Sequence, residues 1–169
     1  MKIRRAELAD AKGIAKVHVD SWRTTYTHII SDDFLHNLSY ERREQLWNNV
    51  IPQGIVFVAV NDEGKIVGFA DGGIERSGKY LDYDGELNAI YLLKEYQGQG
   101  IGTILVKSVV HELKQLGMKS LVVLVLEDNN SRLFYEELGG KCIDTVEIEF
   151  SGKKLKELVY GWDDINILF

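Results

Sequence analysis

Three glycines at alternate positions form the part of the sequence best suited to hold a ligand. Gly98, Gly100 and Gly102 lie in residues 97–103, here called the glycine turn, between an apolar segment and a helical pattern. Glycine permits positive φ angles and close approach of a ligand to the backbone. The N–H groups of such a turn converge with the positive end of the helix that follows. Since the turn contains no lysine or arginine, it predicts a diphosphate site built mainly from backbone amides.

The spacing of the glycines decides which kind of phosphate loop this is. A dinucleotide-binding turn requires G-x-G-x-x-G, and a nucleoside triphosphate loop requires G-x-x-x-x-G-K-[ST]; neither pattern fits. Beginning at Gln97 the stretch is Q-x-x-G-x-G, which resembles the acyl-CoA pyrophosphate loop, [RQ]-x-x-G-x-[GA], of the GNAT superfamily of N-acetyltransferases. A plain glycine-rich turn before a surface helix would have the same sequence, so the surrounding chain has to separate the two interpretations.

A second motif follows one helix and one strand later. Residues 128–140 read DNNSRLFYEELGG, which resembles the second GNAT signature, an asparagine followed by a tyrosine in a short helix that ends in Leu-Gly. Asn129 is the motif asparagine by its distance from Tyr135, and Gly140 stands where many members have phenylalanine. Residues 21–26 also resemble the substrate-side segment of one branch of the superfamily. Two loose motifs at the expected separation are far more specific than either alone.

The resemblance implies a role for each matched position. The backbone near Ile90–Leu92 would pair with the pantetheine arm, and an amide there would polarise the thioester carbonyl. Tyr135 is implied as the acid that protonates the departing thiolate, although an aromatic residue on a helix face is also typical of a hydrophobic core. The implied cofactor-binding residues are Ile90, Tyr91, Leu92, Gln97, Gly98, Gln99, Gly100, Ile101, Gly102, Thr103 and Asn129.

A primary amine must lose a proton before it can attack a thioester. An alkylamine with a pKa of ~10 is almost entirely protonated at pH 7, a deficit of roughly 4 kcal/mol. Glu86, at the start of the strand that leads into the glycine turn, is the candidate base, and an exposed strand-end glutamate is the alternative. His28 is the strongest of the rival histidines because it lies beside the aromatic segment 22–26.

Aromatic residues of the amino-terminal third are candidates for the acceptor pocket. These residues are Trp22, Tyr26 and Trp47, although aromatic side chains on amphipathic helices belong more often to the core. Cys142 is expected to be a small buried apolar group.

The hydrophobic pattern predicts the elements that position these residues. Strands are expected at 2–6, 55–60, 65–74, 86–93, 120–126, 146–150 and 155–162. Helices are expected from Asp10 to about Trp22, from Ser31, from Ser39 to Pro52, from Gly100 to Leu116 and from Asn129 or Asn130 to Gly139.

Hairpins at both ends of this order imply antiparallel edges, and the crossover after residue 93 implies one parallel, right-handed pair. The expected fold class is α/β (α+β): a mixed, mostly antiparallel central sheet of about seven strands with helices on both faces, GNAT-like, in a single domain spanning residues 1–169. The tail after residue 162 could dock on the body or on a partner.

Composition excludes several classes of protein. The chain is 45% hydrophobic and 27% charged with a net charge of −6, which argues against general nucleic-acid binding. No apolar run approaches the roughly 18 residues of a membrane span, and the sequence MKIRR lacks the apolar core of a signal peptide. One cysteine excludes an internal disulfide and a cysteine-rich zinc site. We therefore expect a cytoplasmic protein without a metal or a membrane partner.

The expected function is transfer of an acetyl group from acetyl-CoA, the co-substrate, to a primary amine by direct attack in a ternary complex. The acceptor is a small-molecule or peptide amine, and a homodimer is left open. One alternative is a non-catalytic acyl-CoA sensor of the same fold. Another is a nucleotide-binding regulatory domain that binds no CoA.

Overall fold

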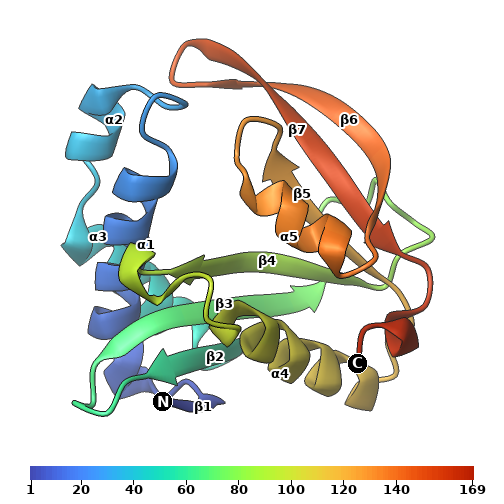
Figure 1. Ribbon diagram of the computed structural model, residues 1–169, viewed down its shortest axis with the longest axis horizontal. Helices are drawn as coiled ribbons and strands as arrows, with labels where there is room; N and C mark the ends of the chain where they lie inside the picture. Colours follow the sequence, from blue (N-terminus) through green and yellow to red (C-terminus); the bar gives the residue numbers. More distant parts are fainter.

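A computed structural model describes all residues, 1–169, and joins seven strands into one sheet of order β1-β2-β3-β4-β5-β7-β6 (Figure 1). The strands are β1 (Lys2–Arg5), β2 (Ile55–Val60), β3 (Ile66–Ile74), β4 (Gly85–Leu92), β5 (Leu121–Leu126), β6 (Lys141–Phe150) and β7 (Lys153–Trp162). The helices are α1 (Ala11–Thr25), α2 (Asp32–His36), α3 (Tyr40–Val50), α4 (Ile101–Gln115) and α5 (Ser131–Glu137).

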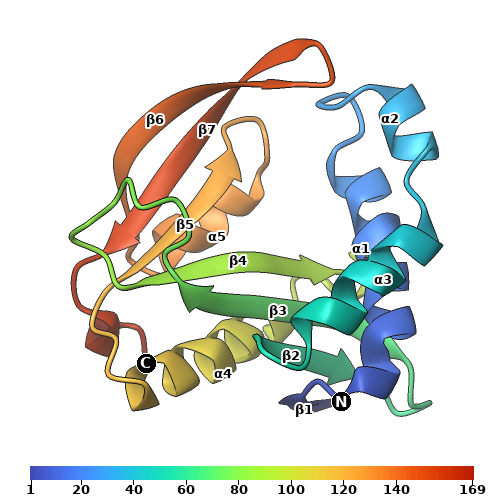
Figure 2. The ribbon, with the colours of Figure 1, turned by 180° about the vertical axis from the view of Figure 1, so that it is seen from behind.

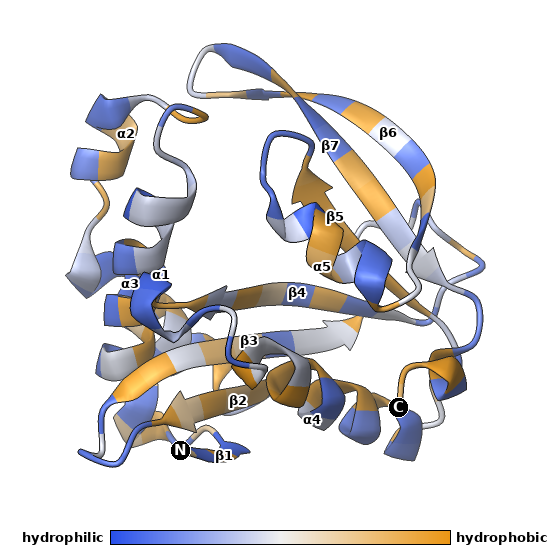
Figure 3. Cartoon of the chain, in the orientation of Figure 1, coloured by the Kyte–Doolittle hydropathy of each residue, from blue (hydrophilic) through white to orange (hydrophobic).

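Alternate residues of the sheet pack into two hydrophobic cores. Phe69 of β3 packs with Ile14 of α1 and Trp47 of α3, whereas the next residue, Ala70, packs with Leu105 of α4. Helix α4 is in front of the sheet in Figure 1, and α3 is in front of it in the reverse view of Figure 2. Strand β5 is apolar along its whole length in Figure 3 because both of its faces are covered.

Strand pairing is antiparallel everywhere except between β4 and β5. This confirms the predicted mixed, mostly antiparallel sheet with helices on both faces. The parallel pairing is short, joining only residues 85–87 to residues 121–123. Beyond it the strands diverge, because β5 keeps its pairing with β7 as far as Leu126 and so follows the β6–β7 hairpin away from β4 (Figure 1). The divergence opens the middle of the sheet.

The structure differs from the sequence-based prediction at a few local points. Helix α1 extends to Thr25, and Asp10 at its start makes no side-chain cap. Its carboxylate instead accepts hydrogen bonds from the Arg4 guanidinium, at 2.6 and 3.0 Å, and from the Glu7 backbone. The expectation of a buried Cys142 is wrong: this thiol is exposed at the start of the edge strand β6.

The tail after β7 docks on the body of the same chain. Ile165 and Leu168 are buried in the core on the α4 side of the sheet, and the Ile165 N–H donates to the Lys119 carbonyl at 2.8 Å. No helix of the chain has both the length and the apolar character that crossing a bilayer would require.

Candidate active site

A cavity of about 670 Å³ lies where β4 and β5 separate. The glycine turn and the last residues of β4 line one end of it. The other end, here called the acceptor end, is lined by Trp22 of α1 and Tyr26 just after it, together with Phe150, Leu155 and Glu157 of the β6–β7 hairpin. The cavity therefore connects the two faces of the sheet through the gap between the strands.

The glycine turn presents its backbone donors without protein partners. Gly98 and Gly100 have φ angles of 70° and 78°, and a Cβ at either position would meet no atom within 4 Å. Helix α4 begins at Ile101, and the N–H groups of residues 98–103 donate to no protein acceptor. The positive φ angles and the helix start together turn this row of amides toward a common point, as an anion site requires.

Most residues predicted at the glycine turn do line the cavity. They are Gln97, Gly98, Gly100, Gly102 and Thr103. Gln99 does not line it and donates its amide to the Glu95 carbonyl at 2.9 Å. Ile101 also does not, because its side chain is buried in the core at 5% exposure. The two can contribute only their backbone N–H groups.

The end of β4 offers a second row of backbone groups. Ile90, Tyr91 and Leu92 line the cavity as predicted. Their partner strand is β3, and the pairing with β5 has already ended at Leu87. No strand pairs with residues 90–92 on the β5 side, so this edge is open to a bound chain of amide groups, apart from the Leu92 carbonyl, which accepts from Gln97 Nε2 at 3.1 Å.

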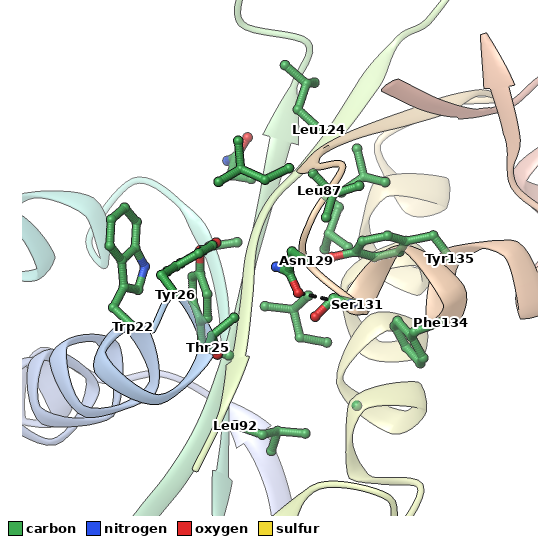
Figure 4. A pocket seen from close by; sticks show the side chains of 18 of the residues that line it. Trp22, Thr25, Tyr26, Leu87, Leu92, Leu124, Asn129, Ser131, Phe134 and Tyr135 are labelled. Atoms are coloured by element: carbon green, nitrogen blue, oxygen red, sulfur yellow. Dashed lines mark hydrogen bonds between the residues drawn. The ribbon is translucent and has the colours of Figure 1, made fainter. Parts of the chain in front are cut away.

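Helix α5 and the residues just before it bring Tyr135 and Asn129 to the same gap (Figure 4). The Asn129 side chain is fixed because its Oδ1 accepts from the Ser131 N–H at 2.9 Å. Tyr135 is 5% exposed, and burial raises the pKa of its hydroxyl. Its neighbour Tyr160 donates a hydrogen bond to Glu136 at 2.6 Å, whereas the Tyr135 hydroxyl has no such partner. A buried, unengaged phenol is therefore aimed into the cavity.

Two predicted aromatic residues at the end of α1 face Tyr135 across the cavity. Figure 4 shows Trp22 and Tyr26 on the side opposite Asn129 and Tyr135. The Tyr26 and Tyr91 hydroxyls are 3.0 Å apart, and burial raises the pKa of both. The Trp22 indole N–H is buried without a partner. These groups give the acceptor end a mostly apolar wall with a few polar hydrogens.

Glu86 lies in the cavity wall, but its carboxylate is engaged. It is 4% exposed and accepts from the Arg76 guanidinium, Nη2 to Oε1 at 2.8 Å and Nε to Oε2 at 3.3 Å. The Arg76 backbone N–H donates to Oε2 at 3.0 Å as well. Sequence reasoning did not single out Arg76, because it lies in a polar loop without a pattern. The ion pair leaves Glu86 few free lone pairs for a proton.

Comparison with known proteins agrees with this geometry. The sequence profile of the "Acetyltransferase (GNAT) family" matches residues 17–140. The chain belongs to this family. It is 45% identical over 166 residues, 98% of this chain and 95% of the other, to "Uncharacterized N-acetyltransferase YuaI" of Bacillus subtilis (strain 168). It is 26% identical over 164 residues, 93% of this chain and 98% of the other, to the spermidine N(1)-acetyltransferase of Thermoplasma acidophilum.

A solved structure supports the fold of this GNAT protein. The crystal structure of PaiA N-acetyltransferase from Thermoplasma acidophilum in complex with coenzyme A superimposes with a TM-score of 0.74 at 22% identity, covering 92% of this chain and 96% of that one. The family resemblance, the fold and the enzyme class predicted from the sequence are therefore confirmed: the protein is an acetyl-CoA-dependent N-acetyltransferase.

Two other candidates fall outside the cavity of this acetyltransferase. His28 is exposed, with a φ angle of 69°, and lines a separate hollow beside Lys153. Trp47 is 3% exposed in the core and donates its indole N–H to His18 Nδ1 at 3.1 Å. Trp47 therefore packs α3 onto the sheet and does not line the acceptor end.

One residue of the GNAT site was missed from the sequence. Glu157 of β7 lines the cavity and is half-buried, and burial raises the pKa of its carboxyl. A signal was present: Leu155 and Val159, two residues to either side on the same strand face, are both buried. A glutamate at that point interrupts an apolar strand face, and such an interruption is an indication of function. No group of three or more His, Cys, Asp or Glu side chains is placed to hold a metal ion.

Proposed function

We propose that this acetyltransferase binds acetyl-CoA in the gap between β4 and β5, with the pyrophosphate on the glycine turn. The observation that carries the proposal is the row of N–H groups of residues 98–103 that donate to no protein acceptor, next to the end of β4, which β5 no longer pairs. Such a row fits a diphosphate followed by an amide-containing arm. Bound there, acetyl-CoA would supply the acetyl thioester at the level of Tyr135.

We propose further that the acceptor amine attacks this thioester directly, in a ternary complex. The cavity reaches from the glycine turn to the acceptor end, so both substrates can be present together. The only cysteine of the chain, Cys142, is exposed and does not line the cavity, so it cannot carry the acetyl group between the two. A carbon–nitrogen bond forms, the carbon–sulfur bond breaks, and the amine releases one proton.

In this proposal Tyr135 serves the leaving group. Its buried hydroxyl has no protein partner and can donate to the departing sulfur. Glu86, with Arg76, forms a fixed polar pair in the wall of the cavity that orients the acceptor. A cationic amine acceptor is supported by the unpaired carboxylate of Glu157 in the cavity and by the similarity to the spermidine N(1)-acetyltransferase of Thermoplasma acidophilum. A sensor without turnover would need neither the acceptor end nor an unengaged phenol.

The test is release of CoA from acetyl-CoA over a panel of primary amines, with Tyr135→Phe as the variant. Removing one hydroxyl leaves the ring packing intact, so folding and CoA affinity should be retained. We expect kcat to fall by roughly a hundredfold, as for a lost general acid. Tyr160→Phe is the matched control because its hydroxyl binds Glu136 outside the cavity, and it should retain wild-type kcat.

Near wild-type turnover of Tyr135→Phe would reduce Tyr135 to a packing residue. Wild-type protein that binds acetyl-CoA but releases no CoA with any amine would favour the sensor instead.

A further inference from the structure

Glu157 is placed at the acceptor end by the strand that carries it. Its backbone pairs with Leu126, the last residue of β5. That position is beyond the point where β4 and β5 have separated, since their pairing ends at Val123. The Glu157 side chain lines the cavity together with Leu155 and Phe150. A carboxylate is thus held over the gap on the side away from α4.

The charges around Glu157 leave it without a direct partner. On β4, Glu86 is neutralised by Arg76 at 2.8 Å. Lys79, in the loop after β3, lies close enough to act on Glu157 but forms no ion pair with it. In the same loop, Tyr80 lies close enough to feel the charge of Glu157, but its hydroxyl donates to Asp144 at 2.9 Å.

The strands on either side of Glu157 add one charged neighbour, Asp144 of β6, which is opposite Val159 and accepts from Tyr80. The residues paired with Glu157, Leu126 on β5 and Val146 on β6, are apolar. At the end of α1, the titratable residue that lines the cavity is Tyr26, whose hydroxyl is bonded to Tyr91. Three carboxylates line the cavity. Glu86 is committed to Arg76, Glu137 of α5 is exposed, and Glu157 is half-buried at the acceptor end without an ion pair.

We infer that Glu157, and not Glu86, is the base that takes the proton from the acceptor ammonium. This inference rests on the proposed function. The N–H bond of the ammonium breaks, an O–H bond forms on Glu157, and the neutral amine then attacks the thioester. The carboxyl group afterwards releases its proton to solvent. Burial, aided by the charge of Glu86, raises the pKa of Glu157 and so favours this proton uptake.

The experiment compares the pH dependence of kcat for Glu157→Gln and Glu86→Gln with that of the wild type. Glutamine keeps the size of the side chain and removes its basicity. For Glu157→Gln we expect kcat at pH 7 to fall about tenfold or more. The deficit should shrink toward about pH 9.5, where the free amine is abundant. Glu86→Gln should lower kcat less and keep the wild-type pH profile.

Two controls separate a base from a structural or binding residue. Glu157→Asp keeps a carboxylate on a shorter chain, so it should show reduced kcat with the wild-type shape of the pH profile. Glu147→Gln changes an exposed glutamate of β6 that pairs with Lys154 outside the cavity, so it should match the wild type. Calorimetric affinity for CoA should be the same in every variant, which also shows that each is folded.

The inference is overturned if an active wild-type enzyme and Glu157→Gln share one pH profile, or if Glu157→Gln changes only the KM of the amine. The inference is also overturned if Glu86→Gln, and not Glu157→Gln, loses kcat at pH 7 and regains it at high pH. Glu86 would then be the base. Wild-type protein that binds acetyl-CoA but acetylates no amine would overturn the proposed function, and this inference with it.

Discussion

Two titratable side chains are buried on the α1 face of the sheet without lining the cavity. His18 is 7% exposed, and burial, with a contribution from the charge of Arg43, lowers its pKa to about 3. It is neutral in the folded protein and accepts the indole hydrogen bond of Trp47. Asp71 is 8% exposed, and burial raises its pKa to about 6 despite a hydrogen bond from Asn88 at 3.2 Å.

These two shifts have opposite effects on stability in acid. Between about pH 6.5 and pH 3 the unfolded chain protonates His18 but the folded protein does not, so stability falls as pH falls. Between about pH 6 and pH 3.8 the folded protein protonates Asp71 but the unfolded chain does not, so stability rises as pH falls. In the shared window Asp71 therefore offsets much of the acid sensitivity that His18 introduces.

Replacing Asp71 with asparagine should make the stability of the protein fall more steeply in acid, because the offset to His18 is removed. Relative to the wild type, Asp71→Asn should lose about 1 kcal/mol more stability for each unit that the pH falls from 6 to 4. Urea unfolding at pH 7, 6, 5 and 4 measures the difference. Asp82→Asn, an exposed aspartate, is the control and should run parallel to the wild type. Parallel curves for Asp71→Asn would mean that Asp71 is ionised in the folded state at these pH values.

At the scale of elements, the site depends on the junction of the glycine turn with α4. Gly102 lies in the first turn of that helix, and a Cβ there would meet Leu92, Ile90 and Phe134 at 3.6–3.7 Å. These are ordinary contacts, so one methyl group fits between β4 and α5. Gly100, with its φ of 78°, would be strained by any side chain. Substitutions at Gly102 can therefore test whether CoA occupies this part of the cavity without straining the backbone.

Two substitutions at Gly102 should separate folding from CoA binding. Gly102→Ala should keep CoA affinity and stabilise the protein by about 0.5–1 kcal/mol, because alanine has the higher helix propensity. Gly102→Val adds two further methyl groups in the space lined by Leu92 and Phe134, and it should weaken CoA binding about tenfold or more. Calorimetry and thermal unfolding measure the two effects. Equal CoA affinity in a folded Gly102→Val variant would place the ligand elsewhere.

A second element-scale feature is the contact that covers the acceptor end. Phe150 of the β6–β7 hairpin packs edge-on against Phe34 of α2, with ring centroids 4.8 Å apart. Ile30 and Leu155 belong to the same small core. The hairpin that pulls β5 away from β4 thus also closes the far end of the cavity, so one element both opens the gap and covers the acceptor end.

At the scale of the whole molecule, charge should select the acceptor. The chain has a net charge of −6. At the acceptor end, Arg76 is already paired with Glu86, while Glu157 has no counter-ion. A cationic amine is attracted both at long range and within the cavity, whereas an acceptor carboxylate would be repelled by Glu157. The site should therefore prefer amines to amino acids of similar size.

A matched pair of acceptors tests this preference. Pentylamine and 5-aminopentanoate differ only by the terminal carboxylate, and we expect kcat/KM to be about tenfold or more higher for pentylamine. The advantage should narrow in 0.5 M salt, which screens charges beyond ~4–5 Å. Equal kcat/KM values for the two acceptors would show that negative charge at the acceptor end does not select the substrate.

The sequence by itself determined the strands, the helices and the glycine turn before α4. These depend on local patterns. Glycines permit the positive φ angles of Gly98 and Gly100, Asn129 and Tyr135 are joined by the start of one short helix, and apolar periodicity marks each strand. The row of backbone amides needs no particular side chain, so the order of elements was enough to predict it.

Only the tertiary structure decided the chemistry of the acceptor end. It paired Arg76 with Glu86, turned Glu157 into the cavity and left His28 outside it. It also buried Trp47 and exposed Cys142. Each outcome depends on which face of a strand or helix meets which distant segment, and on where β4 and β5 separate. Local sequence does not encode those contacts, because they join residues that come together only when the whole sheet has formed.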